Sequence, residues 1–139
     1  MPATTALPSL FVNVVQPIHE GCVLTVRMSP STAAPGRWQL PGGSVEPPHD
    51  GEVLDEAALG SQAARELAEE MGIDTAPEVL RLWVVTRGKN NSIGLTYLAP
   101  AIGSCWGLVR EFGDRVRVRA GGTSRGGVER AAWWWWKRR

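Results

Sequence analysis

One run of nine residues, Arg65 to Ile73, constrains this chain more than any other part of it. Its three carboxylates, Glu66, Glu69 and Glu70, stand at positions i, i+3 and i+4, so on a helix they project from one face. Like charges at this spacing repel by roughly 0.2–0.5 kcal/mol per pair on an exposed helix. A hard divalent cation such as Mg²⁺, which takes oxygen ligands, would remove that repulsion. The run therefore predicts either a metal-binding helix face or a solvated acidic face.

The same run predicts how this helix packs and where it ends. Leu67 and Met71 lie one turn apart and form an apolar stripe on the other face. Arg65 stands one turn before Glu69 and can form an ion pair with it. Gly72 can adopt the left-handed conformation that closes many helices. We therefore expect one buried face, one acidic face and a helix end at Gly72.

A second motif, Leu40-Pro41-Gly42-Gly43, precedes the helix. Pro-Gly-Gly after a short apolar strand lets the backbone turn tightly, and its bare carbonyls can approach a bound ion. Together the two motifs resemble the Nudix box, the signature of the Nudix hydrolases, which is written G-x5-E-x7-R-E-U-x-E-E-x-G-U with U aliphatic. Every specified position from Arg65 onward matches this signature.

The front half of the box departs from the signature. Twenty-one residues separate Gly43 from Arg65, eight more than the signature has, and His49 stands where a Glu is expected. An alignment anchored at Gly51 restores the spacing but puts Ala57 at the Glu position. We prefer the Gly43 anchor because the Pro-Gly-Gly turn belongs there.

The Gly43 anchor makes residues 47–51 an insertion, and we expect residues 47–59 to form a surface excursion that leaves the helix in register. Glu52 and Glu56 are then alternative replacements for the missing carboxylate of the box.

The resemblance implies an α/β fold, the Nudix-type α/β/α sandwich with a mixed β-sheet. It also implies metal-dependent hydrolysis of a diphosphate linkage in a nucleoside diphosphate derivative, such as a nucleoside triphosphate, a dinucleotide polyphosphate or a nucleotide sugar. The implied cofactor is Mg²⁺ or Mn²⁺. The alternative is a non-catalytic module with a degenerate box that senses or binds a nucleotide.

The resemblance also carries roles to single residues. The implied metal ligands are three carboxylates and one backbone carbonyl: Glu66, Glu69, Glu70 and Gly42 or Gly43. Arg65 would orient Glu69 through their ion pair. The general base stays open between Glu66, Glu70 and Glu111.

Expected substrate contacts lie at Gly42 and on two predicted strands. Arg27 ends the strand over residues 21–27, where it can meet phosphates or be a solvated strand end. Tyr97 lies in the strand over residues 93–98, where it can stack on a base or pack in the core. Aromatic residues in strands usually pack in the core.

The resemblance implies a Nudix hydrolase domain at residues 10–120, which a loose arm at residues 1–9 precedes and a compositionally distinct tail at residues 121–139 follows. The net charge is +1, but the part after residue 100 is strongly basic, and the tail contains four consecutive Trp followed by Lys-Arg-Arg. The tail has charge and stacking groups for nucleic acid but no folded platform, so we do not expect a nucleic-acid partner.

Other motifs narrow the field of functions. The two cysteines, Cys22 and Cys105, fit no metal spacing and no disulfide framework. The sequence has no phosphate-binding Gly-x4-Gly-Lys loop. We see neither an export signal nor a membrane span, and expect a cytoplasmic protein with a small-molecule nucleotide as its partner. The sequence leaves a homodimer open.

Overall fold

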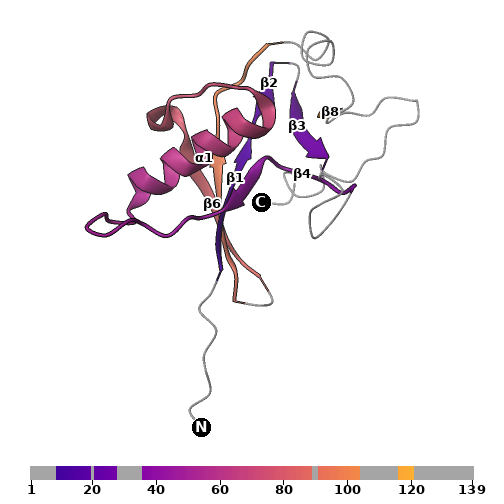
Figure 1. Ribbon diagram of the computed structural model, residues 1–139. Helices are drawn as coiled ribbons and strands as arrows, with labels where there is room; N and C mark the ends of the chain where they lie inside the picture. The colour runs from indigo at the N-terminus through magenta and orange to yellow at the C-terminus, as the bar shows by residue number, and fades with distance from the viewer. Residues whose placement is uncertain (1–8, 20, 28–35, 89–90, 104–115, 121–139) are drawn as a thin grey trace.

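The computed structural model describes residues 9–19, 21–27, 36–88 and 91–103, and the backbone of residues 116–120 (Figure 1). The strands are β1 (Leu10–Val15), β2 (Pro17–Ile18), β3 (Cys22–Arg27), β4 (Trp38–Gln39), β5 (Gly42–Ser44), β6 (Arg81–Arg87), β7 (Ile93–Leu98) and β8 (Val116–Ala120). The helices of this part of the chain are α1 (Glu56–Met71) and the short 3₁₀ helix η1 (Pro77–Val79).

The strands form two sheets. The first has the order β5-β1-β7-β6 and is mixed, because β1 runs parallel to β7 and antiparallel to β5. The second is antiparallel and has β3 paired with β2, β4 and β8. The mixed sheet that the sequence predicts is therefore confirmed.

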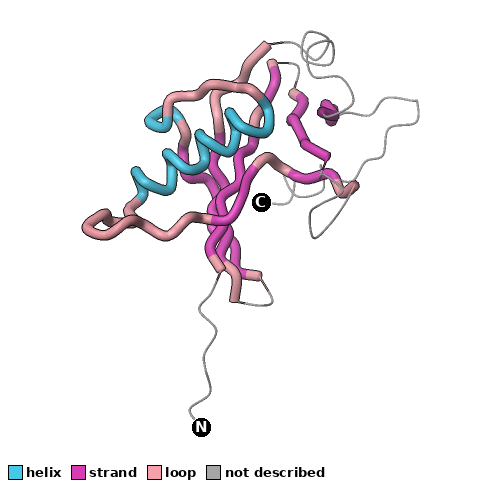
Figure 2. Tube along the Cα trace, viewed as in Figure 1, coloured by secondary structure: helices cyan, strands magenta, loops and turns pink. Residues whose placement is uncertain are grey.

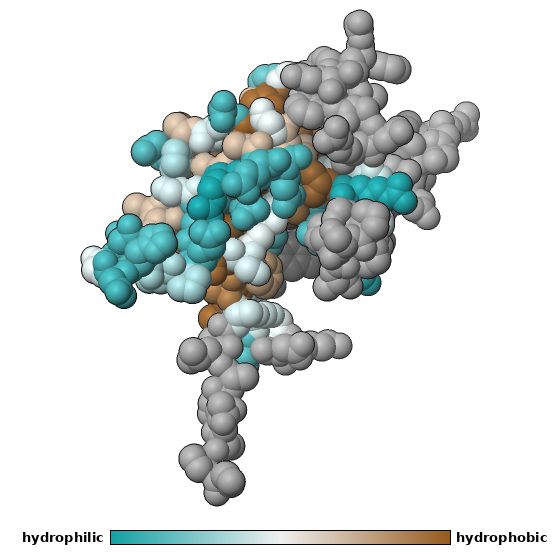
Figure 3. Space-filling view, in the orientation of Figure 1, coloured by the Kyte–Doolittle hydropathy of each residue, from teal (hydrophilic) through white to brown (hydrophobic). Residues whose placement is uncertain are grey.

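Helix α1 lies across one face of the first sheet (Figure 2). Its buried side carries Ala63, Leu67 and Met71, each 0% exposed, which pack into a core shared with Val12 and Val14 of β1. Burying a side chain of the size of Leu or Met contributes about 1.5–3 kcal/mol. Hydrophilic residues cover the outer side of α1 and the loop before it (Figure 3). The predicted division of the helix into apolar and polar faces is confirmed.

Both ends of α1 are capped. Asp55 accepts a hydrogen bond from the Ala58 N–H at 2.8 Å, which satisfies one of the free amides of the first turn. Gly72 has φ 64° and ψ 20°, and its N–H donates to the Ala68 carbonyl at 2.8 Å. The predicted left-handed helix end at Gly72 is confirmed.

Two sequence-based boundaries are wrong. The helix begins at Glu56, so residues 56–59 of the expected excursion are helical, and Leu59 packs against the core. The β-rich run over residues 79–86 predicts a strand that starts at Val79, but strand β6 begins at Arg81, because Pro77 opens the 3₁₀ helix η1 at that point. The strand over residues 93–98 and its hairpin with β6 are as predicted.

Among the described residues, the second helical layer of an α/β/α sandwich has no counterpart. Residues 1–8 of the predicted arm, the predicted tail, Cys105 and Glu111 lie outside the described residues. In the described part of the chain, no helix combines the length and apolar character that crossing a bilayer requires.

Candidate active site

Gly42 and Gly43 lie so close to neighbouring atoms that a side chain at either position would require those atoms to move. A Cβ atom at Gly42 would overlap the Val12 carbonyl oxygen of the neighbouring strand. At Gly43 it would lie 2.6 Å from Oε1 and 2.8 Å from Oε2 of Glu66. Neither glycine has a positive φ, and both belong to β5. The chain bends at Pro41, directly before β5, and the two glycines themselves permit a close approach of backbone and carboxylate.

The carboxylate of Glu66 rests against the backbone of Gly43. Partial burial raises its pKa, and the negative charge of Glu69 raises it further. The positive charge of Arg65 opposes this rise, while Glu46 adds to it. Glu66 is thus a carboxylate whose negative charge is costly in the metal-free protein.

Glu70 lies one turn later and meets the other glycine. Burial raises its pKa to about 7, although a hydrogen bond from the Gly42 N–H favours the charged form. The charges of Glu66 and then Glu69 raise this pKa further. The helix therefore turns two mutually repelling carboxylates toward the glycines of β5.

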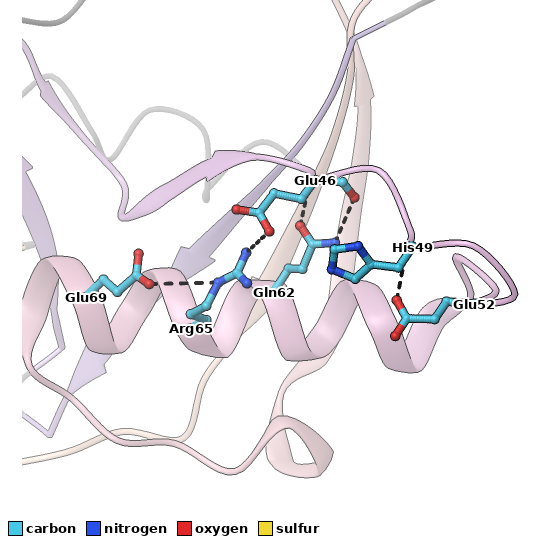
Figure 4. A network of polar contacts seen from close by, with 6 residues as sticks. All are labelled: Glu46, His49, Glu52, Gln62, Arg65 and Glu69. Atoms are coloured by element: carbon cyan, nitrogen blue, oxygen red, sulfur yellow. Dashed lines mark hydrogen bonds and ion pairs between the residues drawn. The ribbon is translucent and has the colours of Figure 1, made fainter.

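Arg65 joins the helix to the loop that follows β5. Its Nη2 lies 3.2 Å from Oε2 of Glu46, and its Nε lies 3.9 Å from Oε1 of Glu69 (Figure 4). The pair with Glu69 is the predicted one. Arg65 and Glu46 are 43% and 69% exposed, so their ion pair contributes little to the free energy of unfolding and serves mainly to orient the two side chains.

Glu46 was missed by the sequence reasoning, which offered Glu52 or Glu56 as the carboxylate of the front half of the box. Glu52 instead accepts a hydrogen bond from the His49 N–H at 3.2 Å inside the loop, and Glu56 begins α1. Glu46 could have been found as the only acidic residue between Gly43 and the Pro-Pro pair.

Gln62 holds the backbone of Glu46 with its side-chain amide. The Glu46 N–H donates to Oε1 of Gln62 at 2.8 Å, and Nε2 of Gln62 donates to the Glu46 carbonyl at 3.3 Å (Figure 4). No sequence motif indicated this contact, because it depends on how the loop folds back onto the helix.

Two predicted substrate-binding residues, Arg27 and Tyr97, lie apart from this cluster. Among the described residues, neither contacts it. Arg27 is exposed at the end of β3, paired with Trp38, and its guanidinium lies beside Gly36. Tyr97 is 2% exposed, and its ring lies against Gly60 of α1. The ring therefore packs in the core and presents no open face to a nucleotide base.

The donor set suits a hard divalent cation. In residues 9–103, apart from those not described, no three His, Cys, Asp or Glu side chains gather closely enough to form a complete cage. Mg²⁺ rarely needs such a cage, since one or two carboxylates usually hold it together with waters and substrate phosphates. Glu66 and Glu70, whose charges already interact beside the Gly42 and Gly43 backbone, fit that requirement.

The fold and the cluster together define a mixed-sheet domain with an acidic helix face set against a glycine strand. The sequence matches the NUDIX domain over residues 9–103, which is more than half of the chain. The chain therefore belongs to the NUDIX family, as its resemblance to the Nudix box predicted. A comparison with curated proteins gave no match.

Solved structures share the fold. A NUDIX hydrolase from Nitrosomonas europaea is 24% identical with a TM-score of 0.52, and the match covers 81% of this chain and 57% of that one. A MutT protein from Methanosarcina mazei Go1 is 25% identical with a TM-score of 0.53, and the match covers 71% and 68%. A bifunctional NMN adenylyltransferase/ADP ribose pyrophosphatase from Francisella tularensis is 19% identical with a TM-score of 0.56, over 84% and 35%. The chain thus spans little more than half of the first of these proteins.

Proposed function

We propose that this domain hydrolyses a diphosphate linkage in a nucleoside diphosphate derivative, with Mg²⁺ or Mn²⁺ as its cofactor. The observation that carries the proposal is the contact of Glu66 and Glu70 with the backbone of Gly43 and Gly42. Membership of the NUDIX family supports it. The Francisella tularensis protein, which has a similar fold, was solved with AMP and a Mn ion.

The residues that would hold the metal are Glu66, Glu69 and Glu70, with a backbone carbonyl at Gly42 or Gly43. When bound, the metal neutralises charge on the diphosphate oxygens and lowers the pKa of a water. Bringing this cation to the helix face also offsets the repulsion that raises the pKa of Glu66 and Glu70.

The chain's own residues position these groups. The Gly42 N–H holds the carboxylate of Glu70, and Arg65 orients Glu69. A carboxylate would take the proton of the attacking water, and Glu66 and Glu70 of this cluster and Glu111 outside it stay alternatives for that base. The cytoplasmic location and the homodimer stay predictions from the sequence.

A panel of nucleoside triphosphates, dinucleotide polyphosphates and nucleotide sugars tests the proposal. Products would be separated by chromatography after incubation with Mg²⁺, with Mn²⁺ and with a chelator. We expect a nucleoside monophosphate or inorganic phosphate products from at least one class, only with metal. Binding of a nucleotide without metal-dependent turnover of any member would favour the sensing module instead.

A further inference from the structure

Three side chains of α1, each one turn after the last, contact the β5 strand or Glu46, which lies two residues beyond its end. Gln62 bonds the backbone of Glu46, Glu66 rests against Gly43, and Glu70 accepts from the Gly42 N–H. The helix positions ascend by four while the partners descend along the chain, so the two segments run antiparallel. The first of these contacts is neutral, and the other two involve the carboxylates of the candidate site.

Glu46 is the last residue of this segment that is attached to the helix. The residue before it, Val45, donates its N–H to the Leu10 carbonyl at 2.8 Å and belongs to the sheet. After Glu46, the hydrogen bonds of the loop are local, between His49 and Glu52. Gln62 therefore marks the boundary between the anchored strand and the long loop that leads to α1.

We propose that Gln62 is a positioning residue, which fixes the strand of Gly42 and Gly43 against the carboxylate face of α1. This role rests on the proposed function. Both bonds of Gln62 reach the backbone of Glu46, so they hold the chain itself and not only a side chain. Arg65, three residues further along the same helix, holds the carboxylate of Glu46. Motion of the loop then stops at Glu46 and does not reach the glycines.

The test compares Gln62→Met with wild type. Methionine keeps the length and helix propensity of Gln but forms neither hydrogen bond. The bonds lie at the surface, so water replaces them and the domain stays folded. Ser61→Ala is the matched control, since Ser61 is the adjacent helix residue and its Oγ donates only to the Ala57 carbonyl. Gln62→Ala serves as a second variant.

We expect both Gln62 variants to lower kcat about 10-fold on the best substrate of the panel and to leave KM nearly unchanged. The reason is that a displaced carboxylate weakens binding of the transition state more than binding of the substrate. Ser61→Ala should keep the wild-type kcat. A wild-type kcat in both Gln62 variants, or a loss of kcat that only follows loss of folded protein, would overturn the proposal.

Hydrogen exchange of the metal-free protein gives a readout that does not depend on catalysis. The amides of Glu46 and of Gly42 should both exchange several-fold faster in Gln62→Met, while the Val14 amide, which donates to Pro41, keeps its rate. Faster exchange confined to Glu46 would mean a local surface bond and would overturn the positioning role. If wild type turns over no substrate, the proposed function fails, and exchange at Gly42 still decides whether Gln62 holds the strand.

Discussion

Replacing Gly43 with Ala should separate activity from stability. The new Cβ would lie 2.6 Å from the Glu66 carboxylate, so this carboxylate must retreat by about 0.8 Å to reach the ordinary contact distance of 3.4 Å. A misplacement of about 1 Å can cost about 100-fold in rate, so we expect kcat to fall on the order of 100-fold. Because the end of the Glu66 side chain can move and Gly43 has no positive φ, the thermal midpoint should stay the same or rise slightly.

Two further glycines of the same region provide matched controls. Gly42→Ala would drive a methyl group into the backbone of Val12, which cannot yield. Overpacking of this kind costs about 1–3 kcal/mol, and the midpoint should fall by roughly 5–15 °C. Gly60→Ala, on α1, places the methyl 3.9 Å or more from its neighbours. It should raise stability by about 0.5–1 kcal/mol and leave kcat unchanged.

The assay is kcat beside the thermal midpoint from circular dichroism, on all three variants. Gly43→Ala should lose kcat with its midpoint kept, and Gly42→Ala should lose its midpoint. A wild-type kcat in Gly43→Ala would refute the argument that catalysis requires the Glu66 carboxylate at its position beside Gly43.

Three other predictions concern the helix and the tail. Arg65→Ala should lower kcat at least about 10-fold, because it frees the carboxylates of Glu46 and Glu69. Because both carboxylates are exposed, the free energy of unfolding should fall by less than about 1 kcal/mol. A large loss of stability in a urea titration would contradict this. The raised pKa of Glu70 means that protonation favours the folded state, so its contribution is complete below pH 4.5 and is lost as the pH rises through about 7. The thermal midpoint of the metal-free wild type should therefore exceed that of Glu70→Gln by less and less as the pH is raised from about 5 to about 8. A difference that does not change with pH would refute the assignment of this pKa to Glu70. Trypsin should cleave after Arg125 before it cleaves after Arg119, which lies in β8 opposite Val23 of β3; the reverse order would contradict a tail outside the domain.

The sequence predicted those parts of the fold that depend on local pattern. A β-rich run bounded by Pro17 predicts a strand over residues 10–15, and β1 has these bounds. The end of α1 followed from Gly72, and the acidic face from the spacing of the carboxylates. Asp55, a favourable N-cap before an alanine-rich stretch, was a signal for the start of the helix that the motif spacing obscured.

The parts that the sequence did not predict depend on contacts between distant residues. Gln62 and Glu46 are sixteen residues apart, and only the folded loop brings them together. The need for glycine at positions 42 and 43 likewise depends on tertiary contacts, since the atoms that a side chain there would meet belong to β1 and α1. For Tyr97 the strand pattern favoured a packed ring, as the structure has it, but nothing in the sequence excluded a ring stacked on a base.

The proposed function places hydrolysis of a diphosphate linkage at the acidic face of α1. The most direct measurement is kcat of Glu70→Gln with Mg²⁺ on the best substrate of the panel. Glu78→Gln is its control, because Glu78 is an exposed carboxylate in η1. The account predicts that kcat falls by several orders of magnitude in Glu70→Gln, with the fold intact, and stays at the wild-type value in Glu78→Gln. A wild-type kcat in Glu70→Gln would contradict it.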